Sequence, residues 1–293
     1  MIETINNIFG IDNEISAPIL ISLIVFIIGS FGRLAVNSII NYSTRHQIRI
    51  SFRNIMNEII LKSRTKTKHV NEFKNSLKID LNDNWTLKFT RITYLELAFN
   101  QDFNLIYKSF ITLFKFRLKR KLRQKAFNKV WSILETLQFT ENRIIKDFEY
   151  FATIFNKYES SYYKNLEELR QENDELMHPI IGKKIKKSDL PENVFYYLIE
   201  RDKIFKSWQK IDEKIRRQRF VVYENLVNPL YQLNLKNQQI DLTLKQNTIL
   251  LAAIHEYEQM TNFLSVNRQI FQNHLIIYKT TDRLLCKCYD LLK

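Results

Sequence analysis

The chain of 293 residues carries a formal net charge of +14, and its estimated pI is 9.6. This basic balance favours anionic partners, namely nucleic acid, nucleotides or an anionic membrane surface. Four glycines and four prolines are too few for a turn-rich fold, so we expect an all-α chain of long helices. The only cysteines, Cys286 and Cys288, exclude a disulfide framework, and we interpret them as free thiols in a reducing compartment.

An apolar segment near the N-terminus is the first element. Residues 15–32 hold no charge and consist mostly of Ile, Leu, Val and Phe. Such a run is long enough to begin spanning a hydrocarbon core, so we predict one transmembrane helix over residues 15–42, with Arg33 reaching toward the headgroups. A cleaved signal peptide fits poorly because residues 1–14 contain acids and no Lys or Arg. The other alternative is a buried core helix of a soluble protein.

Charge asymmetry predicts the orientation of this helix. Basic residues follow the apolar run at Arg33, Arg45, Arg49, Arg53, Lys62, Arg64, Lys66 and Lys68. The positive-inside rule therefore places residues 1–14 outside as a short extracytoplasmic N-terminus and the bulk of the chain in the cytoplasm. Residues 43–80 repeat apolar side chains at helical spacing and are predicted to form a basic amphipathic stalk.

The rest of the chain divides into two helical regions. Residues 81–178 form the first, within which residues 86–100 fit either a strand or a helix. Residues 179–190 form a linker that contains proline and glycine. The second region, 191–293, is predicted to contain helices at 191–226, 229–235, 239–264 and 266–292, with joints at Asn228-Pro229 and Ser265.

A seven-residue apolar repeat marks one helix of the first region, which we expect to begin with Thr140 as its N-cap. Its apolar positions alternate in steps of four and three: Ile144, Phe148, Phe151, Phe155, Tyr158 and Tyr162, with Leu169 and Leu176 in the same phase. A period of 3.5 residues predicts coiled-coil-like packing along a partner helix, in this chain or in another copy.

A polar stripe runs along the apolar helix. At about 100° per residue, the small and polar side chains fall within an arc of about 120°, comprising Ser22, Gly29, Ser30, Arg33, Asn37, Asn41 and Thr44. Small and polar residues on one face are typical of helix association in membranes or of a wetted pore. We predict a homo-oligomer that assembles through this face. The alternative is that the residues beyond Arg33 lie outside the bilayer, where polar side chains need no partner.

Three basic blocks are candidate sites for an anionic ligand. The densest comprises Lys115, Arg117, Lys119, Arg120, Lys121, Arg123 and Lys125; a second includes Lys183 and Lys184, and a third includes Arg216 and Arg217. Such blocks bind phosphates without sequence preference, so we expect a nucleic-acid or nucleotide ligand. Attraction to an anionic leaflet is the alternative.

Catalytic signatures are weak. An Arg and a His at R-x(4–6)-H spacing occur at Arg268 with His274 and at Arg64 with His69, the pattern of HEPN-type ribonucleases, but chance alone predicts about one such match. The chain lacks a P-loop, a dinucleotide-binding glycine motif, a nucleophile elbow and a clustered Cys/His set. We therefore expect no enzyme, no cofactor and no metal.

The combined layout resembles effectors of bacterial anti-phage defence. Its elements are an external N-terminus, one anchor with a polar stripe, a basic stalk and a cationic helical body. It is most similar to the DNA-gated membrane effectors of the Hailong system. The resemblance implies a bacterial inner-membrane location and a homo-oligomer, with a tetramer favoured. It further implies a membrane channel and a cytoplasmic part that binds single-stranded DNA oligomers.

Three functional hypotheses follow. The first is an oligomeric membrane effector gated by an anionic ligand, an abortive-infection channel or membrane-disrupting protein. The second is a membrane-anchored scaffold whose heptad-patterned helix docks a partner protein. The third is a membrane-tethered ribonuclease that uses Arg268 and His274.

Overall fold

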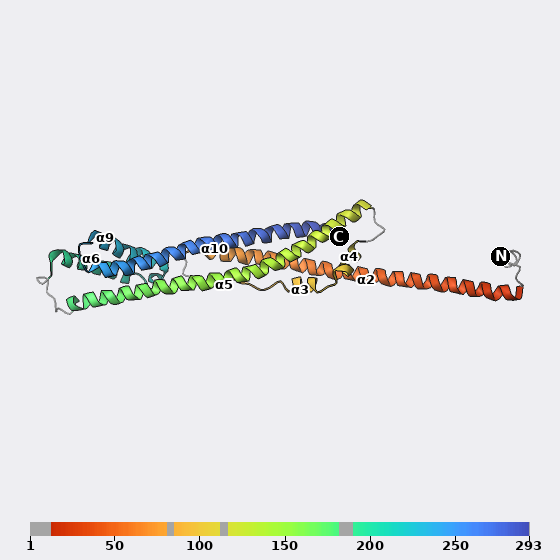
Figure 1. The fold of residues 1–293 in the computed structure, drawn as a ribbon, viewed down its shortest axis with the longest axis horizontal. Coiled ribbons are helices and arrows are strands. Elements are labelled where there is room, and N and C mark those ends of the chain that lie inside the picture. Colours follow the sequence, from red (N-terminus) through yellow and green to blue (C-terminus); the bar gives the residue numbers. More distant parts are fainter. Residues whose placement is uncertain (1–12, 81–84, 112–116, 182–189, 293) are drawn as a thin grey trace. The chain divides into compact units, whose positions relative to one another are not determined.

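The fold is known from a computed structural model, which describes residues 13–80, 85–111, 117–181 and 190–292. Within these ranges every regular element is a helix, as expected for an all-α chain (Figure 1). The elements, in chain order, are α2 (Asn13–Ser76), α3 (Thr93–Phe99), α4 (Phe103–Phe110), α5 (Arg117–Ile181), α6 (Glu192–Gln209), α7 (Glu213–Arg216), α8 (Arg219–Val222), η2 (Tyr223–Val227), α9 (Asn228–Lys236) and α10 (Thr243–Leu292).

The chain divides into two compact units. Unit 1 comprises 1–61, 92–133 and 284–293, and unit 2 comprises 62–91 and 134–283. The division differs from the predicted split at residues 179–190, because the three long helices α2, α5 and α10 each contribute to both units.

Aromatic side chains form the core of unit 1. The rings of Phe52 from α2, Phe110 from α4 and Phe127 from α5 pack together, with centroids between 5.8 and 6.2 Å apart. All three side chains are buried. Trp131 extends this cluster toward Phe103, whose ring centroid lies 4.9 Å away. Aromatic pairs of this kind, edge-to-face or tilted, stabilise a core beyond the area they bury, so α4 and α5 are held against α2.

Three helices form the main core of unit 2. Phe73 of α2 makes edge-to-face contacts with Phe148 of α5 at 5.4 Å and with Phe271 of α10 at 4.7 Å. The heptad positions of α5 face this core: Ile144, Phe151, Phe155, Tyr162 and Leu169 are buried, and Phe148, Tyr158 and Leu176 are half-buried. The repeat therefore identified the packing face of α5 within this chain.

Short helices complete unit 2. Helix α6 packs against α9 and η2, and α7, α8 and η2 follow one another in contact. The η2 segment is a π-helix that ends at Val227, and α9 begins at the next residue, Asn228, with Pro229 in its first turn. Proline lacks an amide proton and is well placed at the first turn of a helix. The predicted joint at Asn228-Pro229 is therefore a change of helix type with no loop between the elements.

Four predicted boundaries were wrong. Helix α5 is continuous through Thr140, whose hydroxyl donates to the carbonyl of Thr136 at 2.7 Å in place of capping a helix start. Helix α10 runs without a joint at Ser265. The predicted helix 191–226 instead ends at Gln209, and the carboxylate of Asp212 caps the next helix by accepting from the amide of Lys214. Helix α5 also extends to Ile181, into the predicted linker.

The ambiguous segment 86–100 and the cysteines are also resolved. Residues 85–92 have no regular secondary structure, and α3 begins at Thr93. Neither a strand nor a single long helix forms there. Neither cysteine forms a disulfide, as predicted; Cys288 is buried and Cys286 is half-buried. Residues 182–189, in the remainder of the predicted linker, lie outside the described residues.

Candidate functional sites

The apolar half of α2 is the largest exposed hydrophobic surface of the described chain. Its large side chains are open from Ile21 to Tyr42; Phe26 is 72% exposed and Ile39 is 67% exposed. The most apolar window of this helix has a mean hydropathy of 2.0 and no buried residue. Twenty residues from Ile21 to Ile40 rise about 30 Å, which matches a hydrocarbon core. A core helix of a soluble protein would be buried, so the helix is long and apolar enough to cross a membrane.

The polar stripe lies on this open surface. Ser22, Arg33, Asn37 and Asn41 are exposed and Ser30 is half-buried. A Cβ atom at Gly29 would meet no other atom, so a second helix could approach closely there. The hydroxyl of Thr44 is satisfied within the helix, donating to the carbonyl of Ile40 at 2.9 Å.

An arginine cluster forms in unit 1 where α2 meets α5. Arg49 and Arg53 of α2 and Arg123 of α5 are half-buried. Burial lowers the pKa of Arg123, and the positive charges of Arg53 and Arg49 lower it further. Arg53 also donates to the carbonyl of Leu292 at 2.9 Å and lies over the ring of Phe110. The packing thus holds like charges together on a fixed scaffold, and an anion would relieve their repulsion.

The densest basic block belongs partly to this cluster. Arg117 is the first residue of α5, the side chains of Lys119, Arg120, Lys121 and Lys125 are exposed, and Arg123 turns toward α2. Lys115, Lys183 and Lys184 lie outside the described residues. Sequence reasoning assigned Arg49 and Arg53 to the stalk alone, because nothing in their spacing indicates that Arg123, seventy residues further on, packs beside them.

Arg216 and Arg217, from the third block, line an open groove of unit 2. Its volume is about 840 Å³, and its apolar floor includes Leu169, Phe205 and Leu226. The guanidinium of Arg216 stacks on Trp208 at 5.4 Å, and Arg216 also donates to the carbonyl of Gln209 at 2.8 Å. Arg217 pairs with Glu213. The charge of Arg217 is thus balanced by an acid, whereas Arg216 is held by a neutral carbonyl and an aromatic ring, so the groove is an amphipathic surface with less unbalanced charge than the block suggests.

The two Arg–His pairs do not converge in the structure. His274 is buried, and its Nε2 lies 2.8 Å from Oδ2 of Asp147, whereas Arg268 is exposed. Six residues of helix rotate two side chains by about 240°, so α10 presents them on different faces. Arg64 pairs with Asp282 at 3.2 Å, while His69 lines a separate hollow with Trp85 and Lys88. This geometry favours a packing role for His274 over catalysis.

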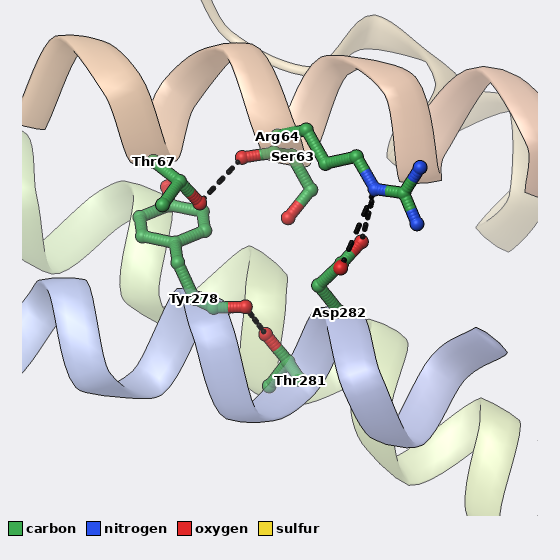
Figure 2. Close-up of polar contacts among 6 residues, drawn as sticks. All are labelled: Ser63, Arg64, Thr67, Tyr278, Thr281 and Asp282. Carbon is green, nitrogen blue, oxygen red and sulfur yellow. Dashed lines mark hydrogen bonds and ion pairs between the residues drawn. The ribbon is translucent and has the colours of Figure 1, made fainter. Parts of the chain in front are cut away.

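A line of polar contacts runs along α2 and α10 near these residues, and one of them, the pair of Arg64 and Asp282, joins the two helices. Figure 2 shows the ion pair between Arg64 and Asp282, with the hydroxyl of Thr67 donating to the carbonyl of Ser63 at 2.9 Å. On α10 the hydroxyl of Thr281 donates to the carbonyl of Tyr278 at 3.0 Å. The exposed pair of Arg64 and Asp282 links the two helices, whereas the hydroxyls of Thr67 and Thr281 are satisfied within their own helices.

A buried ion pair lies beside this line of contacts. Nζ of Lys66 is 3.3 Å from Oε1 of Glu141, with both side chains about one-twentieth exposed, and the hydroxyl of Tyr278 donates to the same carboxylate at 3.3 Å. The ammonium also lies over the ring of Phe89. Burial lowers the pKa of Lys66, opposed by Glu141, and burial with Glu141 raises the pKa of Tyr278.

In the described part of the chain, no three His, Cys, Asp or Glu side chains lie close enough together to bind one metal ion. Comparison with protein-family models, curated proteins and solved structures finds no match to this chain.

Proposed function

We propose that this chain is a membrane-anchored homo-oligomeric effector, in which the first half of α2 crosses the membrane and the helical body binds an anionic ligand that controls the membrane segment. The main support for this proposal is the exposed apolar run from Ile21 to Ile40, because the same helix continues beyond it and bears the arginine cluster. A bacterial anti-phage channel or membrane-disrupting protein is the form of this function that we favour, from the layout of the chain. The membrane of residence would be the inner membrane, with the bulk of the chain cytoplasmic.

The stripe from Ser22 to Asn41 supports self-assembly. Hydrocarbon does not drive apolar helices together, so association in a bilayer relies on close packing and polar contacts. Gly29 offers close approach, and Arg33 and Asn37 offer hydrogen bonds near the membrane surface. A monomeric anchor would leave these groups without a partner at the apolar surface.

Distance favours a soluble anion over lipid headgroups as the ligand of the arginine cluster. Arg49 lies nine residues beyond Ile40, about 14 Å along the helix axis, and Arg53 lies about 20 Å beyond it. The headgroup layer on each side of a bilayer is about 5–8 Å thick, and physiological salt screens charges beyond about 8 Å. Arg49 therefore lies about one screening length beyond the headgroups and Arg53 lies further out, so leaflet attraction declines across the cluster, and we propose phosphates of a single-stranded nucleic acid as the ligand.

The oligomer is tested by the native mass of the full-length protein in mild detergent. We expect a discrete oligomer for the wild type and for Ser38→Leu, since Ser38 lies about 120° from the centre of the stripe. Asn37→Leu should lower the native mass and abolish membrane depolarisation in cells. A wild-type monomer, or equal behaviour of the two variants, would refute assembly through the stripe.

The ligand is tested by titrating a fluorescent single-stranded oligonucleotide at several salt concentrations. Charge reversal of Arg49, Arg53 and Arg123 to Glu should weaken binding and make the slope of log K against log salt shallower by about 2. Reversal of three exposed lysines of unit 2, Lys157, Lys210 and Lys279, serves as the control of equal charge. Equal loss in both triple variants would indicate non-specific attraction only, and binding of anionic vesicles without oligonucleotide binding would assign the cluster to lipid.

A further inference from the structure

A buried polar cluster lies in unit 2 where four helices meet. It comprises Tyr197 and Arg201 from α6, Asn234 from α9 and Gln246 from α10, with Asn173 of α5 at its edge. Arg201, Asn234 and Gln246 are completely buried, and Tyr197 is 2% exposed. A fully buried arginine is rare unless it is paired, so its partners decide what this cluster can do.

The partners of Arg201 are neutral. Its Nε donates to Oδ1 of Asn173 at 3.0 Å, and its Nη1 donates to the hydroxyl of Tyr197 at 3.3 Å and to Oε1 of Gln246. The guanidinium lies over the ring of Phe205 at 5.4 Å. The acid that acts on Arg201 electrostatically, Glu172, is committed to the exposed Lys245 at 2.5 Å. Arg201 therefore forms no ion pair within the described residues.

The cluster holds more donors than acceptors. Nη2 of Arg201, Nε2 of Gln246 and Nδ2 of Asn234 are buried without a hydrogen-bond partner. Flipping the side-chain amide of Gln246 does not satisfy its open donor, because the Arg201 guanidinium can only donate hydrogen bonds and therefore requires Oε1 of Gln246 to face it. Reversing Asn234 exchanges one unsatisfied atom for another, since Tyr197 has a single hydroxyl proton. Two donors, on Arg201 and Gln246, thus remain open in either arrangement.

The open donors and the unpaired positive charge can be satisfied by the same species. An unsatisfied buried donor destabilises the fold, and a buried cation without a counter-charge destabilises it more. A water molecule would satisfy the donors and leave the charge, whereas an anion would satisfy both. Because these side chains are buried, a small anion would displace less of the surrounding packing than a phosphate ester.

We infer that this cluster is a binding site for a small monovalent anion, chloride in physiological salt, held by Nη2 of Arg201 and Nε2 of Gln246. Entry is from the groove that holds Arg216 and Arg217, because two residues lining that groove, Asn173 and Phe205, are the ones that contact the Arg201 guanidinium. Bound there, the anion joins α6 to α10 and neutralises the interior of this part of unit 2. The site is separate from the proposed nucleic-acid ligand and does not depend on it.

The test is thermal unfolding of the full-length protein in detergent, with chloride exchanged for gluconate at constant ionic strength. The melting temperature of the wild type should rise by about 5 °C or more as chloride reaches a hundred times its Kd. Gln246→Glu places a permanent carboxylate beside Arg201, so this variant should melt above the wild type in gluconate and lose its dependence on chloride. Gln269→Glu, an exposed change on the same helix, should retain the dependence.

Two outcomes would overturn the site. A wild-type melting temperature equal in chloride and gluconate would mean that water alone occupies the cluster. A full chloride dependence retained in Gln246→Glu would place the ion elsewhere on this basic chain. If that variant does not fold, Asn234→Asp supplies the internal carboxylate in its place, and line broadening of the chloride NMR signal by the wild type measures binding without a variant.

Discussion

Removal of the Lys66 ammonium is the perturbation with the clearest expected magnitude. The substitution Lys66→Met keeps the aliphatic bulk of the side chain and deletes its charge. Glu141 then keeps its carboxylate in the core, with the hydroxyl of Tyr278 at 3.3 Å but without the ammonium at 3.3 Å. The prediction concerns the charge alone, because methionine fills irregular core space with little strain.

Both side chains are nearly inaccessible, so the interaction is not screened as a surface pair would be. Breaking a buried pair by removing one partner costs about 3–5 kcal/mol, while replacing both partners by apolar groups is often neutral. For a unit of this size each kcal/mol lowers the melting temperature by about 2–4 °C. We therefore expect Lys66→Met to lower the melting temperature of unit 2 by roughly 6–20 °C, and Lys66→Met with Glu141→Leu to lower it by less than either single change.

The assay is thermal unfolding followed by tryptophan fluorescence, since Trp85 belongs to unit 2 and packs edge-to-face on Phe155 at 4.4 Å. Lys68→Met provides the matched control, because its ion pair with Glu72 is exposed and should contribute below about 1 kcal/mol. The reasoning fails if Lys66→Met and Lys68→Met melt together, or if the double variant is the least stable of the set.

Three further outcomes are expected. His274→Ala should lower the free energy of unfolding by about 1–3 kcal/mol, because it removes the contact to Asp147, whereas Arg268→Ala, at an exposed position, should change it by less than about 0.5 kcal/mol. Thermal unfolding measures both variants, and equal losses of stability would instead indicate a joint role for the two residues. Burial, assisted by Glu224, Tyr223 and Asp80, raises the pKa of Tyr257 from 10 to about 12, so the folded state retains this proton after the unfolded state has released it. The contribution of this proton to stability is complete below pH 10 and is lost between pH 10 and 12. The fall of the melting temperature over that pH range should therefore be smaller in Tyr257→Phe than in the wild type, and equal to the wild type in Tyr150→Phe, where the ring is exposed. Trp85→Phe should cost about 1 kcal/mol by losing its hydrogen bond to the carbonyl of Ser76 at 2.7 Å, measured by urea unfolding followed by circular dichroism, and a neutral result would show that the ring alone matters.

Features set by local pattern were predictable from sequence. The uncharged run before Arg33 identified the exposed apolar helix, and the scarcity of glycine and proline identified an all-helical chain. The heptad positions of α5 identified its buried face, because burial follows side-chain periodicity whichever partner covers it. Whether the apolar helix crosses a membrane stays a prediction.

Features set by tertiary contacts were not predictable. A threonine such as Thr140 can cap the start of a helix or lie in its middle, where its hydroxyl donates to the carbonyl four residues earlier. The break after Gln209 contains no glycine or proline and is closed by the Asp212 cap. His274 meets Asp147 across 127 positions, and no spacing within α10 reveals that contact. The sequence around Arg201 carried no signal, since the importance of this residue comes from the lack of an ion pair with it among the described residues.

The continuity of α2 through residues 21–61 fixes the azimuth of the arginine cluster relative to the membrane stripe. At about 100° per residue, Arg49 and Arg53 point about 140–180° away from the centre of the stripe. In a ring assembled with the stripe toward its axis, these cations would face outward, where a long polyanion could pass along the perimeter and contact several copies. Inserting two residues between Ile40 and Arg49 would turn the cations inward by about 200° while leaving both surfaces intact. The number of residues between the stripe and the cluster, more than any single contact, would then decide which side of the assembly meets the ligand.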